Sequence, residues 1–219
     1  MSPLLAAPHE LASVSASQLE IPGTNVSRET WERLERFVAL LLEENQRQNL
    51  IGRSTVDEIW QRHIADSAQL VRFAPRPDSS WLDIGSGAGL PGMVIASLSE
   101  GPVTLAEPRK LRADFLLRVA QDLGLGERVT VLAAKAERIT GKFDVITARA
   151  VGSLGNLLAI SQHLSTDKTI WVLPKGKSAQ SELDEARQAW QGAFRLEPSA
   201  TSGEAAILVA AGVRRKGRK

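Results

Sequence analysis

The sequence predicts an α/β fold in which parallel strands alternate with helices behind a small N-terminal helical cap. Beyond about residue 80, short apolar runs of strand length alternate with segments of helical periodicity. The first of these runs ends in a glycine-dense turn, at residues 81–92, and a helical pattern follows directly. Before that point the recurring pattern is helical.

The N-terminal part of the chain divides into two expected regions. Residues 1–22 are rich in Ala, Ser and Pro without a clear period, so we expect them to be disordered. A helical pattern runs over residues 27–48. Thr-Val-Asp-Glu at 55–58 is typical of a capping box that opens a second helix, which Pro75 then helps to end. Residues 23–78 are therefore predicted to form the helical cap.

The rest of the chain predicts one sheet with helices between its strands. The expected strands are 81–84, 103–106, 129–133, 143–147 and 169–173, and the expected helices are 90–98, 110–123, 154–163 and 178–190. In the helix 110–123, the spacing of Leu111, Phe115, Val119 and Leu123 predicts that they face inward. Residues 194–197 and 205–211 follow without a helix between them and should form an antiparallel pair.

Five parallel strands and a terminal hairpin are typical of the Rossmann-like, seven-stranded sheet of S-adenosylmethionine-dependent methyltransferases. We expect this domain to span residues 79–213 and to be followed by a basic C-terminal tail, 214–219. A dinucleotide dehydrogenase would more naturally continue with a second mononucleotide-binding half.

The glycine-rich turn predicts a nucleotide-type cofactor site. Residues 87–92 match the G-x-G-x-x-G of dinucleotide-binding folds, but Asp83 stands at the strand end just before the turn. A carboxylate beside a pyrophosphate would place two anions in one confined site, whereas it suits the ammonium and sulfonium groups of S-adenosyl-L-methionine. We therefore expect Asp83, Gly85, Gly87 and Gly89 to hold that cofactor.

Further candidates follow the next three strands, since ligands bind at the carboxyl ends of parallel strands. Glu107, about 20 residues after the glycine-rich turn, is suited to bind the ribose hydroxyls. The alternative is that it is a surface carboxylate paired with Arg109. Glu137 or adjacent backbone could receive the adenine amino group, or Glu137 could simply begin a helix. Arg149 lies in an apolar stretch where an unpaired guanidinium is costly, so we favour a contact with cofactor and acceptor over a structural ion pair.

Composition narrows the function classes. The formal net charge is only +2, but the pI is about 9.1 and basic residues gather at 109–118 and 214–219, which suits a polyanionic partner or, for the tail alone, a solvated end. No apolar run approaches a membrane span and no signal peptide is recognisable, so we expect a cytoplasmic protein. Nothing in the sequence specifies an oligomeric state.

The absence of cysteine excludes several chemistries. The chain can form no disulfide and no thiolate metal site, and we expect it to bind no metal. Methylation of pyrimidine carbon 5 ordinarily needs a cysteine nucleophile, and radical methylation needs a cysteine-held iron–sulfur cluster. The [N/D]-P-P-[Y/F] motif that clamps exocyclic amines is also missing. The acceptor is therefore expected to be an atom that is already nucleophilic.

Several short motifs resemble one family, RsmG (GidB), bacterial methyltransferases that act on guanine N7 of 16S rRNA in the small ribosomal subunit. The motifs are Asn49-Leu50-Ile51, Arg62-His63-Ile64-Ala65-Asp66-Ser67, Gly89-Leu90-Pro91-Gly92, Phe143-Asp144, Arg149-Ala150 and Pro174-Lys175-Gly176. The resemblance covers about residues 27–211. It implies that the acceptor is the guanine at position 527 of that RNA.

The resemblance also implies roles for individual residues. It places cofactor contacts at Gly85, Leu90, Ala136, Glu137 and Arg149, and a basic RNA-binding surface that includes Lys175. Family members often carry a different acid after the second strand, where this chain has Glu107 followed by Pro108.

The acceptor chemistry explains why no catalytic constellation is visible. Guanine N7 has a lone pair and no proton to lose, so alignment is the main requirement, and Arg149 is the residue to which we assign a catalytic role. We interpret His63 as structural, with Asp66 as a potential partner one turn on. The alternatives are a methyltransferase for a small molecule or protein, an NAD-dependent oxidoreductase, and a non-catalytic cofactor-binding module.

Overall fold

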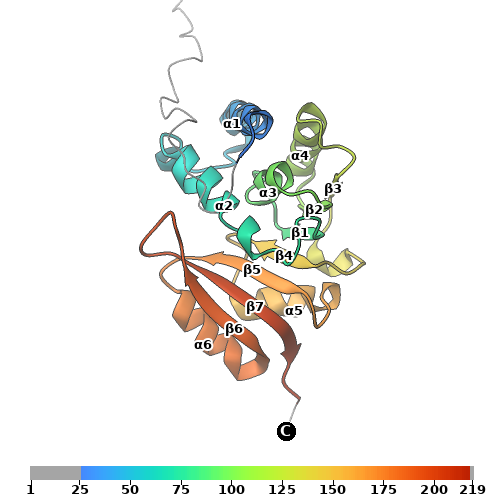
Figure 1. Cartoon of the computed structure of the whole chain (residues 1–219), viewed down its shortest axis with the longest axis vertical. Helices are drawn as coiled ribbons and strands as arrows, with labels where there is room; N and C mark the ends of the chain where they lie inside the picture. Colours follow the sequence, from blue (N-terminus) through green and yellow to red (C-terminus); the bar gives the residue numbers. More distant parts are fainter. Residues whose placement is uncertain (1–25, 218–219) are drawn as a thin grey trace, which may run out of the picture.

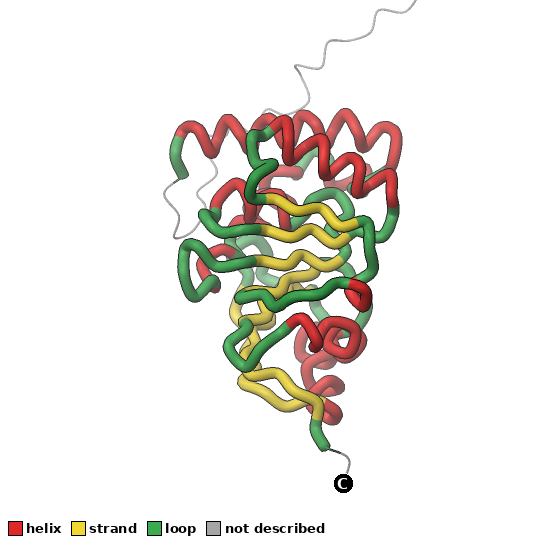
Figure 2. Tube along the Cα trace, turned by 90° about the vertical axis from the view of Figure 1, so that its right-hand side faces the viewer, coloured by secondary structure: helices red, strands yellow, loops and turns green. Residues whose placement is uncertain are grey.

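The computed structural model describes residues 26–217, which form a seven-stranded sheet in the order β3-β2-β1-β4-β5-β7-β6 (Figures 1 and 2). The strands are β1 Trp81–Ile84, β2 Val103–Ala106, β3 Val129–Leu132, β4 Val145–Ala148, β5 Ile170–Lys175, β6 Trp190–Pro198 and β7 Ala206–Arg215. The strands β1 to β5 are parallel, and β7 pairs antiparallel with both β5 and β6. The predicted fold class and the terminal hairpin are confirmed.

Helices cover both faces of this sheet and bury two separate apolar clusters. On one face lie α1 Arg28–Gln48, α3 Gly92–Leu98 and α4 Lys110–Asp122; on the other lie α5 Leu154–Ser161 and α6 Ala179–Ala189 (Figure 1). Successive strand residues alternate between the clusters, as Trp81 and Leu82 do in β1. Because both faces are covered, all four residues of β1 are buried.

The helix α1 belongs to the cap and packs on the sheet through α3 and α4 (Figure 1). Its start is set by Ser27, whose side chain accepts a hydrogen bond from the backbone of Thr30, as an N-cap does. Leu34, Phe37, Val38 and Leu41 form its buried stripe. The predicted first helix is thus confirmed to within one residue.

The predicted capping box at residues 55–58 is wrong. The Thr55 hydroxyl does not cap a helix but donates to the backbone oxygen of Gly52 at 2.8 Å. The second helix begins later, as a π-helix over Trp60–Ala65 that continues into α2, Asp66–Ala68. Single-turn π segments are uncommon and often mark functional sites.

The strand β7 extends through Arg215, two residues into the expected basic tail 214–219. Arg214 pairs with Gln191, and Arg215 pairs with Trp190, both in β6. The next residue, Lys216, donates its backbone N–H to the oxygen of Ala189 at 2.9 Å. The expectations for residues 1–22 and 218–219 lie outside the described residues. Within 26–217, no helix is both long and apolar enough to span a membrane.

Candidate active site

The carboxyl ends of the central parallel strands lie level with one another. Ile84 at the end of β1 is in register with Ala106 of β2 on one side and with Ala148 of β4 on the other. The next residue of each strand is therefore Gly85, Glu107 or Arg149, and all three start from the same edge. Since the chain order reverses between β1 and β4, this edge is the switch point at which doubly wound folds bind ligands.

The turn after β1 has a backbone that only glycine adopts without strain. Gly85, Gly87 and Gly89 have φ of +70°, +53° and +86°. A Cβ on Gly85 would also lie 2.6 Å from a methyl of Val151, whereas the nearest atom to a Cβ on Gly87 would be 3.6 Å away. A Cβ at Gly87 would therefore make ordinary contacts and no clash, and Gly87 is partly exposed, so the backbone there is accessible to a ligand.

Glu107 is a buried brace for this turn. Its side chain is almost inaccessible, and Oε2 accepts from the backbone of Gly87 at 2.9 Å, while Oε1 accepts from the backbone of Arg109 at 2.8 Å. The alternative of a surface carboxylate paired with the Arg109 side chain is therefore wrong. The carboxylate still has lone pairs to offer a hydroxyl donor, since each of its oxygens has two.

Asp83 is a fully buried carboxyl with one unsatisfied oxygen. Its Oδ2 accepts from the backbone of Gly92, at the start of α3, at 3.0 Å, while Oδ1 has no hydrogen-bond partner among residues 26–217. Burial raises the pKa of Asp83 to about 7, against the hydrogen bond from Gly92 that lowers it. An orphaned oxygen of this kind is costly alone, so it indicates a place for a cationic or donor group of a ligand.

The three other cofactor residues predicted from the sequence, Leu90, Ala136 and Glu137, differ in how exposed they are. The Leu90 and Ala136 side chains are 4% exposed and belong to the two apolar clusters. Glu137 follows β3 in a 3₁₀ turn, Ala136–Arg138, and is exposed. Each of them therefore follows the carboxyl end of β1 or β3, on the same edge as the glycine-rich turn.

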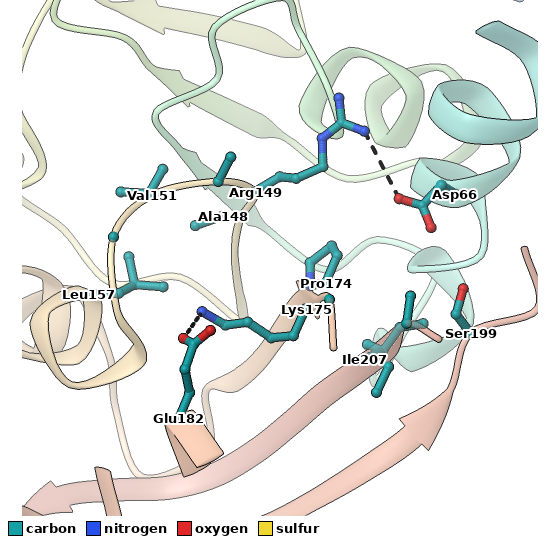
Figure 3. A pocket seen from close by; sticks show the side chains of 15 residues that line it. Asp66, Ala148, Arg149, Val151, Leu157, Pro174, Lys175, Glu182, Ser199 and Ile207 are labelled. Carbon is teal, nitrogen blue, oxygen red and sulfur yellow. Dashed lines mark hydrogen bonds and ion pairs between the residues drawn. The ribbon is translucent and has the colours of Figure 1, made fainter. Parts of the chain in front are cut away.

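A cavity of about 370 Å³ opens beside the turn, over the ends of β4 and β5 (Figure 3). Its size is that of a small-ligand site. Arg149 and Asp66 stand on one side and the Lys175–Glu182 pair on another (Figure 3). The loop that follows Arg149 turns sharply, because Ala150 has a φ of +58°, which is uncommon outside glycine. Strained backbone of this type is concentrated at functional sites.

Arg149 is largely buried and held by groups from the cap. One guanidinium nitrogen, Nη1, lies 3.1 Å from Nδ1 of His63 and 3.9 Å from a carboxylate oxygen of Asp66. Asp66 in turn accepts from Thr201 at 2.8 Å, in the β6–β7 loop. Burial lowers the pKa of Arg149, although Asp66 and Asp83 raise it. The sequence predicted Arg149 as a residue of the site, but it did not predict the contact between Arg149 and His63. The partner expected for His63 was Asp66.

Lys175 lies in the cavity with its charge already paired. Its Nζ is 2.8 Å from Oε2 of Glu182, and its side chain is 10% exposed. Glu182 also accepts from the Ser178 hydroxyl at 2.8 Å and the backbone of Leu154 at 3.1 Å. Although burial raises the pKa of Glu182, the hydrogen bonds from Lys175 and Ser178 bring it below its ordinary value. Lys175 is thus one half of a cavity ion pair, and its partner was not predicted.

Two of the basic residues expected to face a polyanion are paired with carboxylates. On α4, Lys110 is paired with Asp114 at 2.8 Å, and Arg118 is paired with Glu44 at 3.1 Å. Arg112 remains near the turn, since one of its nitrogens would lie 3.8 Å from a Cβ on Gly87. Across residues 26–217, no group of three or more His, Asp or Glu side chains is arranged to hold a metal ion.

The sheet order, the terminal antiparallel hairpin and the glycine-rich turn define a Rossmann-like methyltransferase. The structure is similar to that of a ribosomal protein L11 methylase from Lactobacillus delbrueckii subsp. bulgaricus, with a TM-score of 0.56 and 14% identity over 71% of this chain and 79% of that one. At that identity the likeness concerns the fold alone.

The chain belongs to the family described as rRNA small subunit methyltransferase G, whose model matches residues 30–204. It is 48% identical to "Ribosomal RNA small subunit methyltransferase G" of Rhizorhabdus wittichii, over 88% of this chain and 90% of that protein. It is 46% identical to the protein of the same name from Zymomonas mobilis, over 89% and 91%.

Proposed function

We propose that this protein transfers a methyl group from S-adenosyl-L-methionine to N7 of one guanine in 16S rRNA, on the small ribosomal subunit in the cytoplasm. The proposal is supported by two observations. Val151, which lines the Arg149 cavity, packs against Gly85 of the glycine-rich turn, and the chain belongs to the rRNA small subunit methyltransferase G family. One edge of the sheet thus offers a cofactor cradle and an adjoining acceptor cavity.

The residues of the cradle fit the cofactor. The sulfonium of S-adenosylmethionine would supply an electrophilic methyl group. Asp83 has an unsatisfied buried oxygen for the cofactor ammonium, and Glu107 has acceptor capacity for the ribose hydroxyls. Ala136 and Glu137, after β3, would receive the adenine. The backbone at Gly85, Gly87, Gly89 and Leu90 would line the same site.

Replacing Asp83 with asparagine should stabilise the fold and weaken cofactor binding. The folded-state pKa of about 7 lies above the ordinary 3.8, so ionising Asp83 costs stability that grows as pH rises from about 4 to 7. Urea denaturation should therefore show a gain of a few kcal/mol for Asp83→Asn at pH 8 that shrinks toward pH 4. Calorimetry should show weaker binding of S-adenosylmethionine, since the neutral amide attracts its ammonium less.

Parallel pH dependences of unfolding for variant and wild type would contradict this account of Asp83. Ser97→Ala serves as a matched control, because Ser97 is a buried polar residue on α3 whose hydroxyl donates to the backbone oxygen of Met93 at 2.9 Å. It should leave both the pH dependence and the cofactor affinity unchanged.

The acceptor cavity supplies position rather than acid–base chemistry. Guanine N7 presents a lone pair in the ring plane and no proton, so the reaction asks for alignment and exclusion of water. Apolar side chains of Val151, Leu157, Pro174 and Ile207 line the cavity and suit a base face. Arg149 can hydrogen-bond the cofactor carboxylate or stack on the purine through its planar guanidinium.

Lys175 is proposed as a substrate-binding residue of the same cavity. Its ammonium has three donors, of which Glu182 takes one in this structure, so it can still meet a phosphate or a base oxygen. Surface arginines and lysines would supply the remaining phosphate contacts, and the target base would have to be unstacked to enter.

The rate of the transfer step should show no requirement for a deprotonated enzyme base. The His63 imidazole, which contacts Arg149, has a pKa lowered to about 4 by burial and by Arg149, so it does not titrate near neutrality. Single-turnover rates with saturating cofactor should therefore change little across about pH 6 to 8. A rate that rises tenfold per pH unit over that range would count against the proposed acceptor.

The direct test uses methyl-labelled S-adenosylmethionine and ribosomal subunits from cells that lack this modification. Label should enter the 16S RNA of small subunits. Large subunits and added small molecules should remain unlabelled. Labelling of protein or of a small molecule alone would overturn the proposal in favour of that acceptor class.

A further inference from the structure

The His63 imidazole is held at both of its nitrogens. Nε2 lies 2.9 Å from the Thr55 hydroxyl, and Nδ1 lies 3.1 Å from Nη1 of Arg149. The Thr55 hydroxyl lies 2.8 Å from the backbone oxygen of Gly52, to which it donates. A chain of hydrogen bonds therefore runs from the backbone carbonyl of Gly52, in the cap, to the guanidinium at the cavity. Its last link joins His63 and Arg149, which are 86 positions apart in the sequence.

The donors in this chain can point in only one direction. A guanidinium has no acceptor, so Nδ1 of His63 must accept from Arg149 and carries no proton. Nε2 must then carry the proton of the neutral ring and donate it to Thr55. Since the Thr55 hydrogen is directed to Gly52, its oxygen lone pairs face the ring. Every donor has an acceptor, and one tautomer satisfies the whole chain.

Local structure holds the ring in place. His63 lies in the π-helix Trp60–Ala65, and its backbone oxygen accepts from the Ser67 hydroxyl at 2.6 Å. The charged groups that act on it are Arg149 and Arg62, both cations. Asp66, from the following turn, lies beside the same guanidinium and not against the ring. A proton on Nδ1 would therefore face a cation and break the contact.

We propose that His63 is a positioning residue for Arg149: as the neutral Nε2–H tautomer, set by Thr55, it accepts from the guanidinium and orients it over the cavity. The helical cap thereby determines how the arginine after β4 is presented. The inference deepens the proposed function and rests on it for its kinetic test, whereas its spectroscopic test is independent of any activity.

The kinetic test compares three substitutions that separate an acceptor role from a packing role. In His63→Asn the amide oxygen lies near the position of Nδ1, whereas in His63→Gln the terminal group lies near Nε2, and His63→Leu has neither. If the ring orients Arg149, the Leu and Gln variants should lose about 10- to 100-fold in kcat, and the Asn variant should recover most of that loss.

A packing role predicts a different order. In that case Leu, which preserves the apolar volume, should be the least harmful substitution, and Asn should be no better than Gln. That order, or a wild-type kcat in all three variants, would overturn the inference. Circular dichroism and thermal unfolding would verify that each compared variant is folded.

The spectroscopic test determines the tautomer directly by NMR of protein labelled with ¹⁵N-histidine. The chain has three histidines in all. His63→Asn assigns the signal. We expect His63 to be protonated on Nε2 alone and not to titrate between about pH 5 and 8. Thr55→Val keeps the shape of the side chain but removes the acceptor, so it should admit the Nδ1–H form and lower kcat.

A ring protonated on Nδ1, or doubly protonated at neutral pH, would overturn the inference whatever the enzyme methylates. If instead the tautomer is as expected but wild-type protein methylates no rRNA, then the proposed function fails and the His63–Arg149 geometry stands. Replacing Arg149 with methionine should then still change the Nδ1 signal, and an unchanged signal would refute the contact.

Discussion

Replacing Arg149 with lysine should lower the single-turnover rate of methyl transfer by about 100-fold without unfolding the protein. The guanidinium is planar and carries five donors in a fixed fork, which lets it contact His63 and lie beside Asp66 while it still faces the cavity. A lysine ammonium has one charged centre on a flexible stem, so it cannot contact His63, lie beside Asp66 and face the cavity at the same time. The charge is kept, and only its geometry changes.

The measurement is a single-turnover assay with labelled cofactor and small subunits, accompanied by thermal unfolding. Arg195→Lys is a suitable control, because Arg195 is an exposed residue of β6 whose ion pair with Glu197 lies outside the cavity. Its rate should equal that of the wild type. A wild-type rate for Arg149→Lys would mean that another residue occupies the centre of the site.

Replacing Gly87 with valine should reduce cofactor affinity below the range that calorimetry can measure. Gly87 has a φ of +53°, which costs a β-branched residue roughly 1–2 kcal/mol or more. Its backbone N–H is the donor to Glu107, so a shift of the turn would also displace the proposed ribose contact. The valine methyl groups would extend from the partly exposed turn, where the ligand is expected.

Gly126→Val provides the matched control for this change. Gly126 has no positive φ and is exposed between α4 and β3. A Cβ built on it would have no atom of the described residues within 4 Å. The control should bind the cofactor as the wild type does. Retention of wild-type affinity by Gly87→Val, measured by the same titration, would show that the cradle lies elsewhere.

The sheet and the glycine-rich turn could be predicted because both depend on local sequence. Strand-length apolar runs between helical patterns specify a parallel sheet, and glycines after β1 specify a turn with positive φ. The carboxyl ends of parallel strands meet at one edge whatever the details, so Gly85, Glu107 and Arg149 could be brought together from their order alone. The structure confirms the turn at the end of β1 and the common edge.

The remaining features depend on contacts between distant segments. Thr55 could not be recognised as the acceptor of the His63 ring, since its local sequence is equally compatible with a helix cap. The pairing of Lys175 with Glu182 follows from how α6 packs after β5. Leu111, expected on the inward face of α4, is 71% exposed, because the buried stripe runs through Leu116 instead. The periodicity of apolar residues predicts that a helix forms, but it does not predict which neighbouring segment covers the first turn of that helix.

The central claim is that the cavity at Arg149 presents guanine N7 to the cofactor, and nucleoside analysis tests it most directly. Unmodified small subunits would be incubated with the protein and S-adenosylmethionine carrying a ¹³C-methyl group. Their RNA would then be digested and examined by mass spectrometry, with the position located by cleavage at the modified base. The account predicts labelled 7-methylguanosine at a single guanine of 16S rRNA, which is lost with Arg149→Lys. Label on an exocyclic amine, on another base or at many positions would contradict it.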